Sequence, residues 1–482
     1  MLLKMPQKWR QLLGTKAPWL FALGACLLLG LALLLVDPLF VIVGLAGLLV
    51  TAAILSQPYY GVLLYLFLLY ARPGDMYPQL APLRLTLLGV ALLTAAYGLQ
   101  VLVFRRVKPI ASTPMIFMGL FLLAMILSVP GSFYRTISVD RVTEVLRIVY
   151  MTYLIVHLID TFPRLQGFMV TLCLIMAYLS TSIVLRFFLM PDTRIEGKGG
   201  SGGIAGGFLG DGNDYALAQN VVLPWSMALL GIVRQKYLRL LLFYTIVIGV
   251  LAVSVTYSRG GFLGLATVLL SFYWIWMVRS RRYVEGVVTG IIVVALAVVC
   301  FFAFAPRDFV DRMTSIGEYE QDESALGRLD AWGAGGRMFV DHPFIGVGSG
   351  AFSIAYGMQY KPANAVAANW REAHNVFIQV LGEMGAIGIL TFYGLFFSIW
   401  FLTFKLRHVR LPDWRENRFF HRVRSAVYVS LAGWFVSSMF LSVAYYPHLF
   451  VLVMVVTSLQ YLAKIRSKAG TEVVIIEEVE EE

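Results

Sequence analysis

Charged residues are scarce in this chain. Of its 482 residues, 14% are charged and 59% are hydrophobic, whereas a soluble domain carries about 25% charged residues. The hydrophobic residues form long runs that short charged stretches separate, which favours membrane-spanning helices over the ten-residue alternating strands of an outer-membrane barrel. The sequence therefore predicts an all-α polytopic membrane protein.

Cysteine is scarcer still, and the usual signatures of nucleotide and metal sites are absent. The three cysteines, Cys26, Cys173 and Cys300, all lie in apolar runs, so they predict no disulfide framework. There is no GxxxxGK[ST] phosphate loop, which argues against nucleotide hydrolysis. His and Cys residues do not pair at metal-ligand spacing, and the carboxylates of the predicted outer loops are scattered. We therefore predict no metal and no cofactor.

Apolar runs of about 17–25 residues, the length that crosses a bilayer as a helix, recur along the chain. They predict about 12–14 transmembrane helices, of which the segment 59–71 is the least secure. The approximate segments are 17–36, 39–56, 59–71, 84–104, 113–130, 144–160, 167–190, 214–233, 238–257, 261–278, 286–305, 375–403, 425–444 and 446–463.

The net charge of +11 is better explained by membrane topology than by nucleic acid, because Lys and Arg concentrate at the ends of the apolar runs. Cytoplasmic loops are enriched in these residues. If the N-terminus is cytoplasmic, each strongly basic connection also falls on that side. These connections are 105–108, 234–239, 279–283, 405–424 and 464–468. Both termini are then cytoplasmic.

This topology divides the chain into four parts. Transmembrane helices occupy 1–305 and 375–463, a large outer loop occupies 306–374, and an acidic cytoplasmic tail occupies 464–482. The loop is long for a simple connection, so we expect it to be structured.

The outer loop contains its own helical pattern. Ala325, Leu329, Trp332 and Phe339 recur at helix-like spacing, and His342-Pro343 should end the helix. We predict an amphipathic helix that lies across the outer mouth of the bundle.

Three arginines lie within or beside apolar runs, toward the predicted outer face: Arg147, Arg186 and Arg259. An ionisable group in a membrane helix needs a partner or a function to offset its desolvation. Each arginine could also extend to the lipid headgroups. Arg259 has the strongest functional signal, because Ser258 and two glycines leave backbone groups open to an anion, and a guanidinium suits a phosphate.

His374 is the best candidate for acid–base chemistry. It precedes an uninterrupted helical pattern, so it should lie at a helix N-terminus, where the helix dipole favours the neutral imidazole that can accept a proton. Glu372 or Asn375 could orient the ring. A structural role is also open for this histidine, and Glu383, further along the same helix beside glycines, could serve helix packing alone.

Four stretches together resemble the O-antigen ligase and polymerase superfamily, whose members are membrane glycosyltransferases. The stretches are TYSRGG (256–261), GRLDAW with HPFIGVGSGAF (327–332 and 342–352), EAHNVFIQVLGEMGAIG (372–388) and GDGNDYALAQNVVLPW (210–225), which contains Asn213. The N-terminal ARPGDMYP is similar to the bacterial O-glycosylation ligase subgroup.

The resemblance implies a metal-independent, inverting glycosyl transfer at the periplasmic face of the bacterial inner membrane. The donor would be an undecaprenyl-diphosphate-linked glycan, and the acceptor a glycan, lipid A-core or protein hydroxyl. At matching positions, Arg259 and Arg328 would bind the diphosphate and His374 would be the general base. Asn213, Arg147, Arg186, Glu372, Asn375 and Glu383 are further candidates for substrate binding.

Two alternatives remain open on sequence alone. The chain could be a polymerase that joins lipid-linked repeat units, since the motifs are shared. It could also be a non-enzymatic transporter of a lipid-linked glycan. A transporter predicts internal repeats and polar residues near the membrane midplane, and the sequence shows neither.

Overall fold

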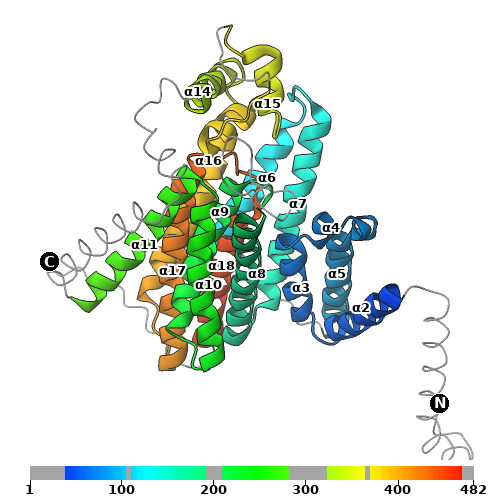
Figure 1. Ribbon diagram of the computed structural model, residues 1–482, viewed down its shortest axis with the longest axis vertical. Coiled ribbons are helices and arrows are strands. Elements are labelled where there is room, and N and C mark those ends of the chain that lie inside the picture. Colours follow the sequence, from blue (N-terminus) through cyan, green and yellow to red (C-terminus); the bar gives the residue numbers. More distant parts are fainter. Residues whose placement is uncertain (1–37, 105–109, 191–208, 282–322, 364–369, 469–482) are drawn as a thin grey trace, which may run out of the picture.

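The computed structural model describes residues 38–104, 110–190, 209–281, 323–363 and 370–468, and every regular element in these ranges is helical (Figure 1). This confirms the predicted all-α class. The elements are α2 (Pro38–Ser56), α3 (Tyr59–Tyr70), α4 (Pro73–Met76), η2 (Pro78–Leu83), α5 (Leu85–Phe104), α6 (Thr113–Ser128), α7 (Arg135–Leu158), α8 (Phe162–Leu189), α9 (Gly212–Leu230), α10 (Lys236–Val255), α11 (Arg259–Ser280), α14 (Glu323–Asp341), α15 (Phe352–Ala355), η6 (Tyr356–Tyr360), α16 (Val376–Lys405), η7 (Leu406–His408), α17 (Trp414–Ser438) and α18 (Pro447–Lys468).

Within the described ranges, five helices are long and apolar enough to cross a membrane. They are Gln79–Val101, Phe162–Leu189, Lys236–Val255, Val376–His408 and Pro447–Arg466. The insecure segment 59–71 forms α3, whose 12 residues span only about 18 Å at the helical rise of 1.5 Å per residue. The predicted spans 17–36 and 286–305 lie outside the described residues.

The helices pack as a bundle with α18 in its interior (Figure 1). α16 packs along α6, and α17 packs along both α9 and α11. Every residue of α18 from 449 to 456 is at most 2% exposed, as expected for a helix that is apolar on all sides.

The end of α17 differs from the prediction. The predicted span 425–444 is a helix that begins at Trp414 and ends at Ser438, and residues 439–446 form a loop before α18. Asp413 caps the helix start, where its carboxylate accepts the N–H groups of Arg415 (2.6 Å) and Glu416 (3.1 Å). A hydropathy pattern misses the earlier start of the helix because the residues there are basic. It also misses the earlier end because the loop that follows is apolar.

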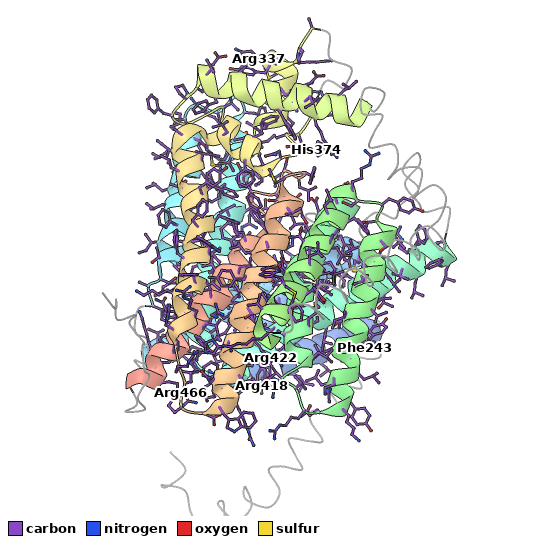
Figure 2. The ribbon with its side chains drawn as sticks, turned by 90° about the vertical axis from the view of Figure 1, so that its left-hand side faces the viewer. Phe243, Arg337, His374, Arg418, Arg422 and Arg466 are labelled. Carbon is purple, nitrogen blue, oxygen red and sulfur yellow. The ribbon has the colours of Figure 1, made fainter. Side chains whose placement is uncertain are left out.

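The helix predicted in the outer loop is present as α14, which ends at Asp341, directly before His342-Pro343. Figure 2 shows it lying across one end of the bundle, with Arg337 on it. The predicted apolar face was partly wrong. Leu329 is 51% exposed, whereas Ala331, Ala334 and Met338 are fully buried against the residues around α15 and η6. The small side chains of Ala331 and Ala334 allow this close approach, and a search for large apolar residues overlooks them.

α16 is interrupted at Gly385, whose φ of 60° and ψ of −152° are not helical. The N–H of Ala386 donates to the Pro343 carbonyl (2.8 Å), and the N–H of Gly348 donates to the Glu383 carbonyl (2.9 Å). The 343–350 loop therefore satisfies backbone groups that the broken helix leaves open, which an apolar environment requires.

Gly385→Ala should destabilise the protein by about 2–4 kcal/mol, because this backbone region is almost restricted to glycine. A Cβ at this position would also lie 2.6 Å from the Phe344 carbonyl carbon. Gly336→Ala is the matched control, since nothing lies within 4 Å of its Cβ position in α14. Thermal unfolding of the purified variants measures the difference, and equal melting temperatures would contradict the prediction.

Candidate functional site

A polar cavity of about 180 Å³ has His374 in its lining, and Figure 2 shows His374 beneath α14 at one end of the bundle. It is lined by five segments: α7, the start of α9, the end of the 343–350 loop, the residues around the first two turns of α16, and the 439–446 loop. The lining residues are Arg141, Asp211, Asn213, Asp214, Gly350, Glu372, His374, Gln379, Glu383, Leu441, Ser442, Tyr445 and Tyr446. Such a concentration of polar side chains in an otherwise apolar chain marks the candidate site.

His374 lies immediately before the N-terminus of α16, as predicted (Figure 2). Its φ of 47° is in the left-handed region, where histidine is tolerated better than most residues. Its N–H donates to the hydroxyl of Ser442 at 3.0 Å. The 439–446 loop thereby holds the backbone of His374 at the wall of the cavity.

Asn375 is the N-cap of α16, and both ends of its amide bind the protein. Its Oδ1 accepts the N–H groups of Phe377 (2.9 Å) and Ile378 (3.1 Å), and its Nδ2 donates to the Met439 carbonyl (3.1 Å). This N-cap holds the helix start against the 439–446 loop. Asn375 is not among the lining residues, so its structural role is the one that these contacts support.

Glu383 is 1% exposed and joins three segments at the cavity. Its carboxylate accepts the N–H groups of Gly350 (2.9 Å) and Phe352 (3.3 Å). It also accepts the hydroxyl of Tyr445. These contacts join the end of the 343–350 loop and the start of α15 to α16 and to the 439–446 loop. Glu383 therefore does more than allow helix packing beside small residues.

Asn213 and two neighbouring acids form the wall at the start of α9. Asp211 is the N-cap, and its Oδ1 accepts the N–H (2.6 Å) and the side-chain amide (2.7 Å) of Asn213. Asp214, one residue further, accepts the hydroxyl of Tyr446 at 3.2 Å. Of these residues the sequence predicted only Asn213, because neither the neighbouring acids nor the distant Tyr446 stand out in a local motif.

Arg141 is the arginine of α7 that lines the cavity, whereas the arginine predicted as a candidate in this segment is Arg147. α7 begins at Arg135, earlier than the predicted 144, so Arg141 is helical. It precedes the buried Val145 and Ile148 by four and seven positions, which places it on the buried face. Arg147 lies on another face of α7 and is exposed. The spacing of four and seven residues from Arg141 to Val145 and Ile148 is the sequence signal that could have identified Arg141.

Arg259 begins α11 close to the loop that holds His374. Ser258 caps this helix, where its hydroxyl accepts the N–H of Gly261 at 2.9 Å. A Cβ on Gly260 would lie 2.8 Å from the Cβ of Phe440. Arg259 and His374 therefore flank the same 439–446 loop at the same end of the bundle, although Arg259 does not line the cavity itself.

Arg328 and Arg186 also lie at this end without lining the cavity. Arg328 is one turn before Trp332 on α14, and the Trp332 indole donates to the Ala373 carbonyl at 2.9 Å, next to His374. Arg186 lies in the last turn of α8. The following residue, Phe187, has its ring 6.0 Å from that of Tyr257, near the start of α11.

The opposite end of the bundle is basic. Figure 2 shows Arg418, Arg422 and Arg466 at the end remote from His374.

Among the described residues, no group of three or more His, Cys, Asp or Glu side chains is arranged to hold a metal ion.

Residues 226–393 match a family model described as O-antigen ligase. The matched stretch contains Arg259, Arg328, Glu372, His374, Asn375 and Glu383. No curated protein matches the chain. The family match, which covers residues 226–393 of 482, confirms the resemblance to O-antigen ligases that the motifs in this part of the chain predict.

Proposed function

We propose that this protein transfers a glycan from an undecaprenyl-diphosphate carrier to an acceptor hydroxyl, with inversion at the anomeric carbon. The observation that carries the proposal is the 439–446 loop. On one side it holds His374 at the wall of a polar cavity, and on the other it packs against the start of α11, next to Arg259. An acceptor base and a cation for the donor are thus neighbours.

The proposed site faces the periplasm. Cytoplasmic connections are enriched in Lys and Arg, and the basic connection 405–424, which contains Arg418 and Arg422, lies at the end away from His374. A cavity at one end of the bundle also favours an enzyme over a transporter, whose site is expected near the membrane midplane.

The transfer needs one base and a set of fixed cations. His374 takes the proton of the acceptor hydroxyl as its oxygen attacks the anomeric carbon. The bond between this carbon and the diphosphate oxygen breaks, and its electron pair leaves with the diphosphate. Arg259 and Arg328 stabilise the charge that develops on the leaving group, while the cavity carboxylates accept hydrogen bonds from sugar hydroxyls.

We propose the ligase activity, with the polymerase as the alternative that the family match equally accommodates. Glycan analysis of a strain lacking the protein separates the two. Intact polymer stranded on its lipid carrier identifies a ligase, whereas single repeats without long chains identify a polymerase.

Purified protein should transfer glycan at an unchanged rate in the presence of a chelator such as EDTA, because the proposed charge stabilisation comes from arginines. The measurement is the initial rate of transfer from undecaprenyl-diphosphate-glycan before and after chelation. A loss of activity that added Mg²⁺ or Mn²⁺ restores would refute the arginine-only mechanism.

A further inference from the structure

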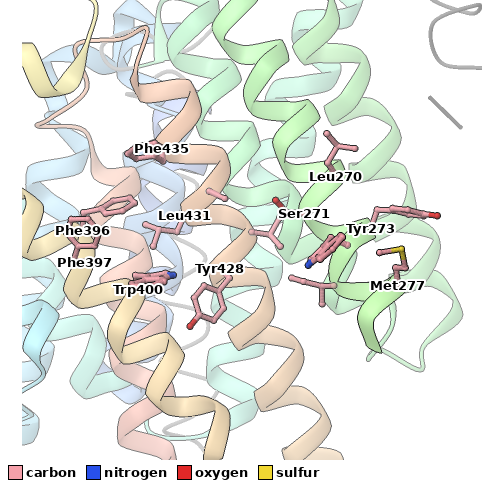
Figure 3. A pocket seen from close by; sticks show the side chains of 14 residues that line it. Leu270, Ser271, Tyr273, Met277, Phe396, Phe397, Trp400, Tyr428, Leu431 and Phe435 are labelled. Atoms are coloured by element: carbon pink, nitrogen blue, oxygen red, sulfur yellow. The ribbon is translucent and has the colours of Figure 1, made fainter. Parts of the chain in front are cut away.

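A large apolar groove lies between α11, α16 and α17, away from the His374 cavity. Its volume is about 860 Å³, and aromatic and aliphatic side chains line it (Figure 3). Phe396 and Trp400 come from α16, Tyr428 and Leu431 from α17, and Leu270 from α11. A groove of this composition in a membrane helix bundle suits a hydrocarbon chain.

A second, cationic cavity of about 610 Å³ adjoins the groove. The two share Trp274 and Ile275 in their linings, so they form one continuous site with an apolar part and a charged part. The titratable side chains that line the charged part are Arg407, Arg410, His421 and Arg424.

No carboxylate is among the described residues that line the cationic cavity. The two acids near the start of α17, Asp413 and Glu416, interact with other groups. Backbone N–H groups of Glu416 and Arg415 donate to Asp413 and lower the pKa of its carboxyl. The Glu416 carboxylate pairs with Arg466. The described lining of this cavity is therefore basic, which suits an anion.

Tyr428 marks the junction of the two parts. The Arg424 guanidinium lies 5.6 Å from the centroid of the Tyr428 ring, and both residues are on α17 one turn apart. In the described part of the chain, the Tyr428 hydroxyl is buried and has no hydrogen-bond partner. An ester or phosphate oxygen at this junction would accept its hydrogen bond.

We propose that this continuous site binds an anionic phospholipid, with its phosphate beside Arg407, Arg410 and Arg424 and an acyl chain in the apolar groove. Basic pockets between transmembrane helices are suited to anionic headgroups. The charge complementarity and the shared wall at Trp274 and Ile275 favour a lipid over a free anion. The site lies apart from the His374 cavity and does not depend on the proposed glycosyl transfer.

Delipidated full-length protein, titrated with phosphatidylglycerol in detergent and followed by native mass spectrometry, tests the proposal. Arg407→Gln/Arg410→Gln should weaken phosphatidylglycerol binding by about 25-fold, at about five-fold per arginine. Ala432→Phe places a ring in the groove and should weaken binding as well. Arg415→Gln, which removes a charge at the start of α17 outside the lining, should bind as the wild type does.

Four results would overturn the proposal. Equal binding of phosphatidylcholine would exclude headgroup recognition, and the same affinity for inorganic phosphate would identify a free-anion site. Unchanged binding by Ala432→Phe would exclude the groove. No binding by the wild type would indicate another occupant, such as the apolar residues 286–305 of the chain itself. A melting temperature close to that of the wild type shows that each variant is folded.

Discussion

Replacing His374 should abolish glycan transfer while leaving donor binding intact. A general base contributes about 100- to 10,000-fold to a rate, and the proposed mechanism gives this role to one side chain. His374 lies outside the predicted diphosphate contacts, so the dissociation constant of the undecaprenyl-diphosphate-glycan should not change. Initial rates and donor binding by the same purified variant provide the two measurements.

The choice of substituent matters at this position, because the backbone of His374 has a φ of 47°. Asparagine tolerates the left-handed region far better than alanine does. His374→Asn therefore removes the imidazole with little backbone strain, and His374→Ala serves as the second variant. His342→Asn is the matched control, since the His342 ring packs edge-on against Phe133 at 5.9 Å and does not line the cavity. Substantial transfer by His374→Asn would contradict the assignment of the base.

The position of His374 could be predicted because its signals are local. An N-cap asparagine followed by a long apolar run marks a helix start, and the structure begins α16 there. Another local signal, His342-Pro343, predicted where α14 ends. Such helix boundaries could be predicted, since each needs only its own neighbours in sequence.

The rest of the site depends on partners far apart in the chain. The 439–446 loop is apolar and was assigned largely to a membrane span. It is a loop because distant side chains satisfy its backbone, such as Gln379, which accepts the N–H of Ala444 at 3.3 Å. The break at Gly385 likewise depends on the 343–350 loop. A periodicity pattern contains no information about such contacts.

Arg259→Ala should weaken donor binding by about 10- to 100-fold, the effect of losing charge-assisted hydrogen bonds to a phosphate. Arg328→Ala should do the same if both side chains contact one diphosphate. The double variant should then lose less than the product of the two single effects, because groups that share a ligand are not independent. Titration of each variant with undecaprenyl-diphosphate-glycan gives the three dissociation constants.

Two further variants make this result specific to a guanidinium at the start of α11. Arg259→Lys keeps the charge but not the paired donors, so it should recover only part of the affinity. Arg147→Ala removes an arginine that is exposed on α7 and should bind the donor as the wild type does. Equal losses for Arg147→Ala and Arg259→Ala would show a general effect of surface charge. Wild-type affinity in Arg259→Ala would remove this arginine from the donor site.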